Sequence, residues 1–253
     1  MLMIMDGIDG RVTVVTGAAG GMGAAIAQLF ADRGAVVAAW DAEPLRSTPP
    51  GGLAQQVDVT DKAAVRGAFD DAERALGPVR IVVHAAGVLR TGSALDAADD
   101  WSACMNVNAT GTVTVASEGA KRLIAAGGGA LTTVSSNAAA SPRTNMAAYG
   151  ASKAAATAFV RSLGLEVANQ GVRCNIVSPG STDTPMLRGM WDSSDQSDSV
   201  IAGDAATYRL GIPLRRLALA EDVAHAALYL SSDAARHVTL HDLRVDGGAT
   251  LDM

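Results

Sequence analysis

Two spacings of apolar residues alternate along most of the chain. Short runs rich in Val, Ile and Ala, typical of buried strands, are followed by segments in which apolar residues recur every three or four positions, typical of helices. The short runs predict strands at residues 11–16, 35–40, 53–59, 79–84, 130–135, 172–177 and 240–245. The helical spacing, often stopped by glycine, predicts helices at residues 21–33, 61–76, 99–126, 147–169 and 221–231.

This alternation of strands and helices indicates right-handed βαβ units, which build a parallel sheet covered by helices on both faces. Since the composition shows no break, we expect one doubly wound α/β domain with a seven-stranded sheet over residues 1–253. Residues 42–52 are rich in proline and glycine and predict a loop. Residues 181–212 are polar and too long for an ordinary connection, so we expect an irregular lid at about 184–212.

Composition and charge narrow the class of protein. Hydrophobic residues make up 49% of the chain, which predicts a packed globular core and not a disordered chain. The formal net charge of −6 argues against a general binder of nucleic acid or of anionic membranes. An anionic ligand would therefore need local arginines or helix N-termini to hold it.

Cysteine use and the N-terminus point to a cytoplasmic protein. Cys104 and Cys174 lie far apart in sequence, which fits neither a disulfide framework nor a zinc site, so we expect two inert buried thiols and no metal centre. The apolar run at residues 1–5 is too short for a secretion signal. No apolar run approaches the ~20 residues that a membrane span requires.

A glycine-rich turn joins the first predicted strand to the first predicted helix. Gly17, Gly21 and Gly23 keep side chains out of this turn, and Met22 stands between the last two. Backbone N–H groups and the helix dipole can then meet a pyrophosphate. A plain tight turn is the alternative, but the strand–turn–helix context favours a dinucleotide site.

Acidic residues follow the next two predicted strands. Asp41 lies eighteen residues after Gly23, where a carboxylate can accept hydrogen bonds from both ribose hydroxyls. It would repel a 2′-phosphate, which favours NAD over NADP; Arg46 is the nearest basic residue that could oppose this. Asp58 precedes Val59 and could either lie near the adenine amino group or cap the following helix.

The strongest candidate for chemistry is a tyrosine–lysine pair in the helix predicted at residues 147–169. Tyr149 and Lys153 are four residues apart and so share one helix face, and Ser136 lies thirteen residues before the tyrosine. Free tyrosine has a pKa of about 10, but a neighbouring ammonium group favours the phenolate. The pair can therefore accept a proton near neutral pH. The alternative is a structural tyrosine on an amphipathic helix.

Together these motifs resemble the short-chain dehydrogenase/reductase family, over essentially the whole chain. The matching segments are the TGxxxGxG turn at residues 16–23, NVNATG at 106–111, PGxxxT at 179–184 and VDGG at 245–248. The resemblance implies a Rossmann fold, NAD as cofactor and a catalytic tetrad of Asn108, Ser136, Tyr149 and Lys153. One departure is His84, which stands where the family carries asparagine, and we expect it to be structural.

The resemblance also implies a role for each site residue. Tyr149 takes a hydroxyl proton, Ser136 hydrogen-bonds the substrate oxygen, and Asn108 anchors a water that relays the proton past Lys153. The residues implied for NAD, besides Tyr149, Lys153 and the glycine turn with Met22, are Asp41, Asp58, Val59, Ala85, Gly87, Pro179, Gly180, Thr182 and Thr184.

Several stretches in the second half resemble, more narrowly, the group within this family that oxidises 2,3-dihydro-2,3-dihydroxybenzoate in catecholate siderophore pathways. This resemblance implies an anionic cyclic alcohol as substrate. The cations that could hold its carboxylate are Arg90, Arg143 and Arg188. Met146 and Met186 could form an apolar wall. The 2-amino counterpart of this substrate, or another cyclic alcohol, stays open.

A regulator that senses NAD without turnover is a hypothesis from another class. Such a protein should have lost part of the tetrad, and the sequence retains all of it. The family usually forms tetramers through the helices that carry Asn108 and Tyr149, so the resemblance implies a homotetramer.

Overall fold

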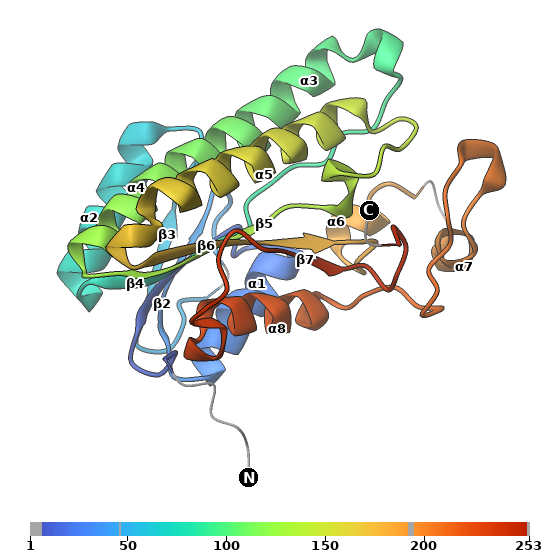
Figure 1. Cartoon of the computed structure of the whole chain (residues 1–253). Coiled ribbons are helices and arrows are strands. Elements are labelled where there is room, and N and C mark those ends of the chain that lie inside the picture. The colour runs from blue at the N-terminus through green and yellow to red at the C-terminus, as the bar shows by residue number, and fades with distance from the viewer. Residues whose placement is uncertain (1–6, 46, 192–194, 252–253) are drawn as a thin grey trace.

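Seven parallel strands form the centre of the molecule, as the apolar pattern predicted (Figure 1). The computed structural model describes residues 7–45, 47–191 and 195–251. Within them the strands are β1 Val12–Thr16, β2 Val36–Asp41, β3 Leu53–Gln56, β4 Val79–His84, β5 Gly129–Val134, β6 Val172–Pro179 and β7 Asp242–Val245. They pair in the order β3-β2-β1-β4-β5-β6-β7. Since β1 lies between β2 and β4, the winding reverses at this strand and the sheet is doubly wound.

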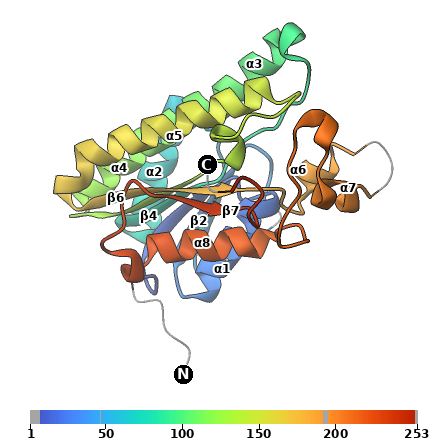
Figure 2. The same ribbon diagram turned by 45° about the vertical axis from the view of Figure 1, so that its right-hand side comes forward.

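Helices cover both faces of the sheet (Figures 1 and 2). On one face α1 (Gly21–Asp32) packs beside α8 (Ala220–Ser231). On the other face lie α2 (Lys62–Leu76), α4 (Gly111–Ala125) and α5 (Ala147–Val167). All five residues of β1 are buried, because helices cover the central strands on both sides. No helix among the described residues is both long and apolar enough to cross a membrane.

The helix predicted at residues 99–126 is present over residues 98–125, but it includes a π-helical segment that the sequence analysis did not predict. The chain forms α3 (Ala98–Cys104), a π-helical segment (Met105–Thr110) and then α4. Apolar spacing cannot reveal the extra residue of a π-helical turn, since the helix stays continuous and amphipathic. π-Helical turns are frequent at functional sites, and this one carries Asn108.

Other boundaries differ by smaller amounts. The third strand ends at Gln56 and not at residue 59, and the sixth strand continues to Pro179. The polar stretch at 181–212 includes α6 (Pro185–Arg188) and α7 (Ser197–Ala202), which lie together beyond the edge of the helical layers in Figure 2. Residues 1–5 and Arg46 lie outside the described residues.

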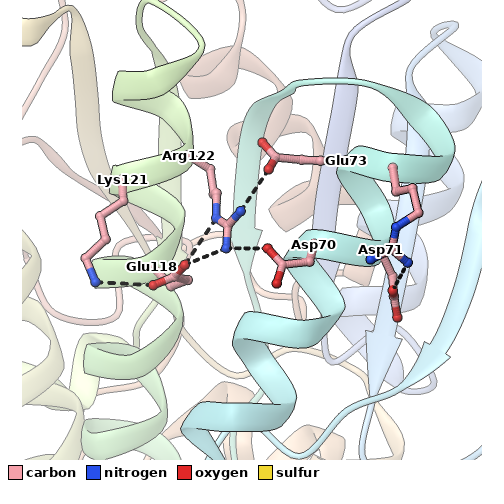
Figure 3. Close-up of polar contacts among 7 residues, drawn as sticks. Asp70, Asp71, Glu73, Glu118, Lys121 and Arg122 are labelled. Atoms are coloured by element: carbon pink, nitrogen blue, oxygen red, sulfur yellow. Dashed lines mark hydrogen bonds and ion pairs between the residues drawn. The ribbon is translucent and has the colours of Figure 1, made fainter.

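An ion cluster joins α2 to α4 (Figure 3). Arg122 of α4 pairs with Asp70 at 2.8 Å and with Glu73 at 3.0 Å on α2, and with Glu118 at 2.7 Å on its own helix. Its guanidinium carbon also lies 5.9 Å from the centre of the Phe69 ring. The cluster ties the second half of α2 to the last turn of α4.

Candidate active site

The turn between β1 and α1 is shaped for close approach to its backbone. Gly17 has a φ of +73°, and a Cβ atom there would lie 2.8 Å from the carbonyl carbon of Ala85. A Cβ atom on Gly23 would lie 2.0 Å from the carbonyl oxygen of Gly17. Only glycine fits at these two positions. The first turn of α1 therefore borders a cavity and can offer backbone N–H groups to an anion.

That cavity lies at the switch point of the sheet, between the ends of β1 and β4, where doubly wound folds bind ligands. It is lined by residues from the glycine turn and from the ends of β2, β3 and β4. The residues predicted for NAD that line it are Gly17, Gly21, Met22, Gly23, Asp41, Asp58, Val59, Ala85, Gly87 and Thr184. These residues fit a nicotinamide dinucleotide. The glycines leave room for a pyrophosphate, and the carboxylate of Asp41 lines the cavity where it could accept hydrogen bonds from a ribose.

Backbone donors hold the Asp41 side chain in place. Its Oδ2 accepts a hydrogen bond from the N–H of Ala19 at 2.9 Å, and its Oδ1 accepts one from the N–H of Glu43 at 2.9 Å. Each carboxylate oxygen has a further lone pair. Asp41 can therefore still accept hydrogen bonds from ribose hydroxyls without moving.

Asp58 lines the same cavity but does not cap α2. Its Oδ1 accepts hydrogen bonds from the N–H and the hydroxyl of Thr60, both at 2.8 Å. The cap of α2 is Asp61, whose Oδ1 accepts from the N–H groups of Ala63 and Ala64. Of the two roles left open for Asp58, only the one in the cavity agrees with its position.

A second cavity adjoins the first and contains the groups predicted for chemistry. Ser136 and Tyr149 line it. So do four further predicted residues, Met146, Pro179, Gly180 and Thr182. Met22, Thr184 and Met186 line both cavities, so the two meet at these side chains. A dinucleotide that filled the first cavity would reach the second beside the tyrosine.

The Tyr149 hydroxyl is a neutral phenol in the protein's own electrostatic environment. Burial raises the pKa of Tyr149, and its side-chain hydrogen bond with Ser136 acts in the opposite direction. Lys153 Nζ lies 6.0 Å from the centre of the tyrosine ring and donates to the carbonyl of Val134 at 3.0 Å. Burial lowers the pKa of Lys153 to about 8. Burial is thus the largest influence on the pKa of Tyr149 and opposes ionisation, while the charge of Arg143 across the cavity favours it.

Asn108 lies behind the wall of the first cavity. Its Oδ1 accepts from the N–H of Val88 at 2.8 Å, while its Nδ2 donates to the carbonyl of Val88 at 2.9 Å and to the hydroxyl of Ser152 at 3.0 Å. Both amide protons are thus used inside the protein. A Cβ atom on Gly87 would lie 3.1 Å from Asn108 Oδ1 and 3.2 Å from Lys153 Nζ, so both groups lie close to that glycine.

His84 links three elements through a directed chain of hydrogen bonds. The Thr112 hydroxyl donates to the carbonyl of Asn108 at 2.6 Å, so it can accept a hydrogen bond from His84 Nε2 at 3.1 Å. The other ring nitrogen, Nδ1, lies 2.8 Å from the hydroxyl of Thr16. That hydroxyl already accepts from the N–H groups of Ala85 and Ala86, so it donates its own proton to Nδ1.

This chain of bonds fixes the state of the histidine as neutral and protonated on Nε2. Burial, followed by the charge of Lys153, lowers the pKa of His84 to about 3. The ring ties β4 to β1 and to α4, which is the structural role expected for it. Through Thr112 it also holds the carbonyl of Asn108 in the π-helical segment.

The three arginines proposed from the sequence occupy different environments. Arg143 lines the second cavity, and its Nη2 donates to Asn137 Oδ1 at 2.9 Å. Arg90 lines the first cavity. Arg188 pairs with Asp183 through contacts of 2.6 and 2.8 Å and borders neither of the two cavities. Of the three, only Arg143 faces Tyr149 across a shared cavity.

Sequence reasoning missed Arg209, which lines the second cavity with Arg143. It belongs to the polar stretch that was interpreted as a lid. Its Nη2 donates to the hydroxyl of Ser181 at 2.9 Å. No spacing or motif marks this arginine, because a hairpin-like loop brings it to the cavity from a distant part of the chain.

Comparisons with known proteins agree with this geometry. The family described as enoyl-(acyl carrier protein) reductase matches residues 17–250. Two relatives are both named 2,3-dihydro-2,3-dihydroxybenzoate dehydrogenase. The one from Bacillus subtilis is 44% identical and the alignment covers 98% of this chain and 99% of the relative. The one from Escherichia coli is 41% identical, with coverage of 96% and 98%.

A solved structure of a 7α-hydroxysteroid dehydrogenase, in complex with NADH and 7-oxo glycochenodeoxycholic acid, is similar in fold. Its TM-score is 0.87 and its sequence is 28% identical, and the match covers 97% of this chain and 96% of that one. Fold, site and relatives therefore lead to one conclusion. The chain belongs to the short-chain dehydrogenase/reductase family, whose members are oxidoreductases that use a nicotinamide dinucleotide.

Proposed function

We propose that the protein oxidises the C3 hydroxyl of 2,3-dihydro-2,3-dihydroxybenzoate with NAD, to give 2,3-dihydroxybenzoate for a catecholate siderophore. The observation that carries this proposal is that Ser136, Tyr149 and Arg143 line one cavity. A proton acceptor and a cation for a carboxylate are therefore within reach of one small ring. The similarity to two dehydrogenases of this name, over nearly the whole chain, supports the same substrate.

The atoms and electrons of this reaction balance simply. C3 loses a hydride and its hydroxyl loses a proton, and the bound NAD supplies the hydride acceptor. The resulting ketone then tautomerises: C2 loses its proton and the C3 oxygen gains one. The products are the aromatic catechol, NADH and one proton. Formation of the aromatic ring favours this direction.

The tetrad residues provide positioning and proton transfer. The Ser136 hydroxyl orients the substrate oxygen, and Tyr149 accepts the hydroxyl proton. Because burial raises the pKa of Tyr149, the phenol needs positive charge on the cavity side in order to ionise, and an oxidised nicotinamide provides it. We propose that Lys153 passes the proton outward. Asn108 holds the segment at Gly87 and Val88 and so places Lys153.

Asp41 supports the choice of NAD. Its two oxygens are fixed by backbone donors at the cavity wall, where a 2′-phosphate would meet a negative charge. Replacing Asp41 by alanine should weaken NAD binding and reduce the discrimination against NADP. Fluorescence titration measures both affinities. If the unchanged protein bound NAD and NADP equally well, Asp41 would not select between them.

NADH formation with two substrates tests the proposed function. The 2-hydroxy and 2-amino dihydrobenzoates should be supplied side by side, and the absorbance of NADH followed. Faster turnover of the 2-hydroxy compound is expected. Faster turnover of the 2-amino compound would assign the protein to 3-hydroxyanthranilate formation. NAD binding without turnover of any cyclic alcohol would favour a sensor.

We also propose a cytoplasmic homotetramer in which residues 184–212 act as a substrate lid. The buried free thiols of Cys104 and Cys174 support a reducing compartment. Met186 and Arg209, both from the proposed lid, line the cavity that holds Tyr149, which supports a role of this segment in substrate binding.

A further inference from the structure

Two arginines from separate parts of the chain lie in the cavity of Tyr149, and neither pairs with a carboxylate among the residues that the structure describes. Arg143 donates to the amide oxygen of Asn137, and Arg209 donates to the hydroxyl of Ser181. Both partners are neutral. Ion pairs with acidic side chains are formed instead by other arginines of the described chain, for example Arg11, Arg122, Arg188 and Arg216.

The carboxylate whose charge acts on Arg143, that of Asp246, already has hydrogen-bond partners of its own. Asp246 Oδ2 accepts hydrogen bonds from the side chain of Asn137 at 3.1 Å and from the hydroxyl of Thr250 at 2.7 Å, and its Oδ1 accepts from the N–H of Gly248 at 2.9 Å. Asn137 thus stands between this carboxylate and Arg143. Burial and then the charge of Arg209 lower the pKa of Arg143, while the charge of Asp246 acts in the opposite direction without outweighing them. The cavity wall therefore has two cations and space for one anion.

The loop that carries Arg209 is built to hold it in place. Asp204 and Arg209 form a pair of backbone hydrogen bonds, both 2.9 Å long. Gly203 has a φ of +81°, and a Cβ atom there would lie 2.4 Å from the backbone nitrogen of Gly211, so the loop closes tightly at its base. Arg209 is therefore presented by a short closed loop and not by an extended strand.

We propose that the carboxylate of the cyclic substrate binds between Arg143 and Arg209, and that Arg209 makes the enzyme specific for carboxylate-bearing alcohols. The inference rests on the proposed function for the identity of the ring, but needs only a carboxylate near Tyr149. Guanidinium groups suit a carboxylate, because their N–H donors match its two oxygens. Without the carboxylate, two half-buried cations would lack an anionic partner, so the pair would disfavour neutral alcohols.

The test compares acids with their neutral counterparts in matched variants. Arg209→Met and Arg209→Lys are examined beside Arg143→Met and the control Arg66→Met, an exposed arginine on α2. Binding of 2,3-dihydroxybenzoate and of catechol, each with NAD present, is measured by calorimetry. Arg209→Met should weaken binding of the acid about 10- to 100-fold and leave catechol binding within about twofold. Arg209→Lys should recover part of the loss, and Arg66→Met should change neither.

Turnover separates this inference from the proposed function. If the protein does not oxidise the dihydroxy substrate but Arg209→Met still selectively weakens the binding of acids, the arginine pair stands and the substrate is another carboxylate. If turnover is as proposed but Arg209→Met weakens acid and catechol equally, or neither, the pair is not the carboxylate site. Circular dichroism and melting temperature show whether each variant is folded.

Discussion

The protonation of Tyr149, the proton acceptor that we propose, depends on all of its surroundings and not on its lysine neighbour alone. Burial raises the pKa of Tyr149, and Lys153 is held by the Val134 carbonyl at 3.0 Å, with its own pKa lowered to about 8. Since burial favours the protonated phenol, we expect Tyr149 to accept a proton only where further positive charge lies close to it. This links proton transfer to cofactor binding.

Replacing Tyr149 by phenylalanine should abolish the group that takes the hydroxyl proton. We expect turnover to fall at least about 10³-fold, as is usual when a positioned general base is lost, while NAD affinity changes little. NADH formation and NAD titration measure the two effects. Tyr229→Phe, on α8 and at the surface, is the control. A variant that kept most of its activity would exclude Tyr149 as the proton acceptor.

The buried lysine should also be visible in the pH dependence of stability. The pKa of Lys153 is lowered from 10.5 to about 8, so between these values the unfolded chain binds more protons than the folded one. The free energy of unfolding is therefore highest above pH 10.5, where the lysine is neutral in both states. It falls as the pH decreases toward 8, because the folded protein must then bury the charged lysine. Between pH 8 and pH 10 the free energy of unfolding should rise by about 2 kcal/mol more than in Lys153→Met.

Urea denaturation of both proteins at these two pH values measures that difference. Lys62→Met, at an exposed lysine of α2, should follow the unchanged protein. If the free energy of unfolding changed by the same amount with pH in the unchanged protein and in Lys153→Met, the lysine would stay charged in the folded state up to its ordinary pKa.

Among the elements, the π-helical segment within the long helix has the largest consequence. The π-helical segment places Asn108 so that its amide holds both backbone groups of Val88. His84 and Thr112 support the same segment from the sheet side. His84, at the position where the family carries asparagine, therefore forms a longer bridge, from the hydroxyl of Thr16 to the hydroxyl of Thr112.

Loss of this bridge should destabilise the protein. His84→Leu leaves the hydroxyls of Thr16 and Thr112 each without one partner in the core, which should cost about 2–4 kcal/mol of unfolding free energy. His84→Asn should cost less, because the shorter amide can still reach one of them. Urea denaturation measures both. His225→Leu, at an exposed position on α8, should be nearly neutral. An unchanged midpoint for His84→Leu would refute the bridge.

For the whole molecule, the layer of α4 and α5 is the surface that we propose for assembly. α4 and α5 lie side by side in both views (Figures 1 and 2). Leu165 of α5 is 69% exposed, on the same helix face as Ala155 and Ala158, and Val113 of α4 is 38% exposed. Small and apolar exposed residues on adjacent helices suit close contact with a second copy.

Sedimentation at micromolar concentration should therefore give a tetramer. Leu165→Glu places a charge in the proposed contact and should shift the protein to smaller species, since a buried unpaired carboxylate is costly. Leu95→Glu, at a leucine that is 93% exposed, is the control and should leave the mass unchanged. A monomer in the unchanged protein would contradict this proposal.

The sequence by itself determined the local features. The seven strands and the five long helices follow from their apolar spacing, and the glycine turn is marked because only glycine tolerates the contacts at Gly17 and Gly23. The seven-stranded parallel sheet was therefore predictable, and so was the helix that holds Tyr149 and Lys153 on one face.

Only the tertiary structure decided which distant side chains meet. Arg209 shares the tyrosine cavity with Arg143, while Arg188 is paired with Asp183, and nothing in local spacing separates these cases. The partners of His84 come from β1 and α4, so its protonation state depends on contacts across 28 and 68 residues of sequence. Such contacts are set by packing between layers, which no periodicity along the chain records.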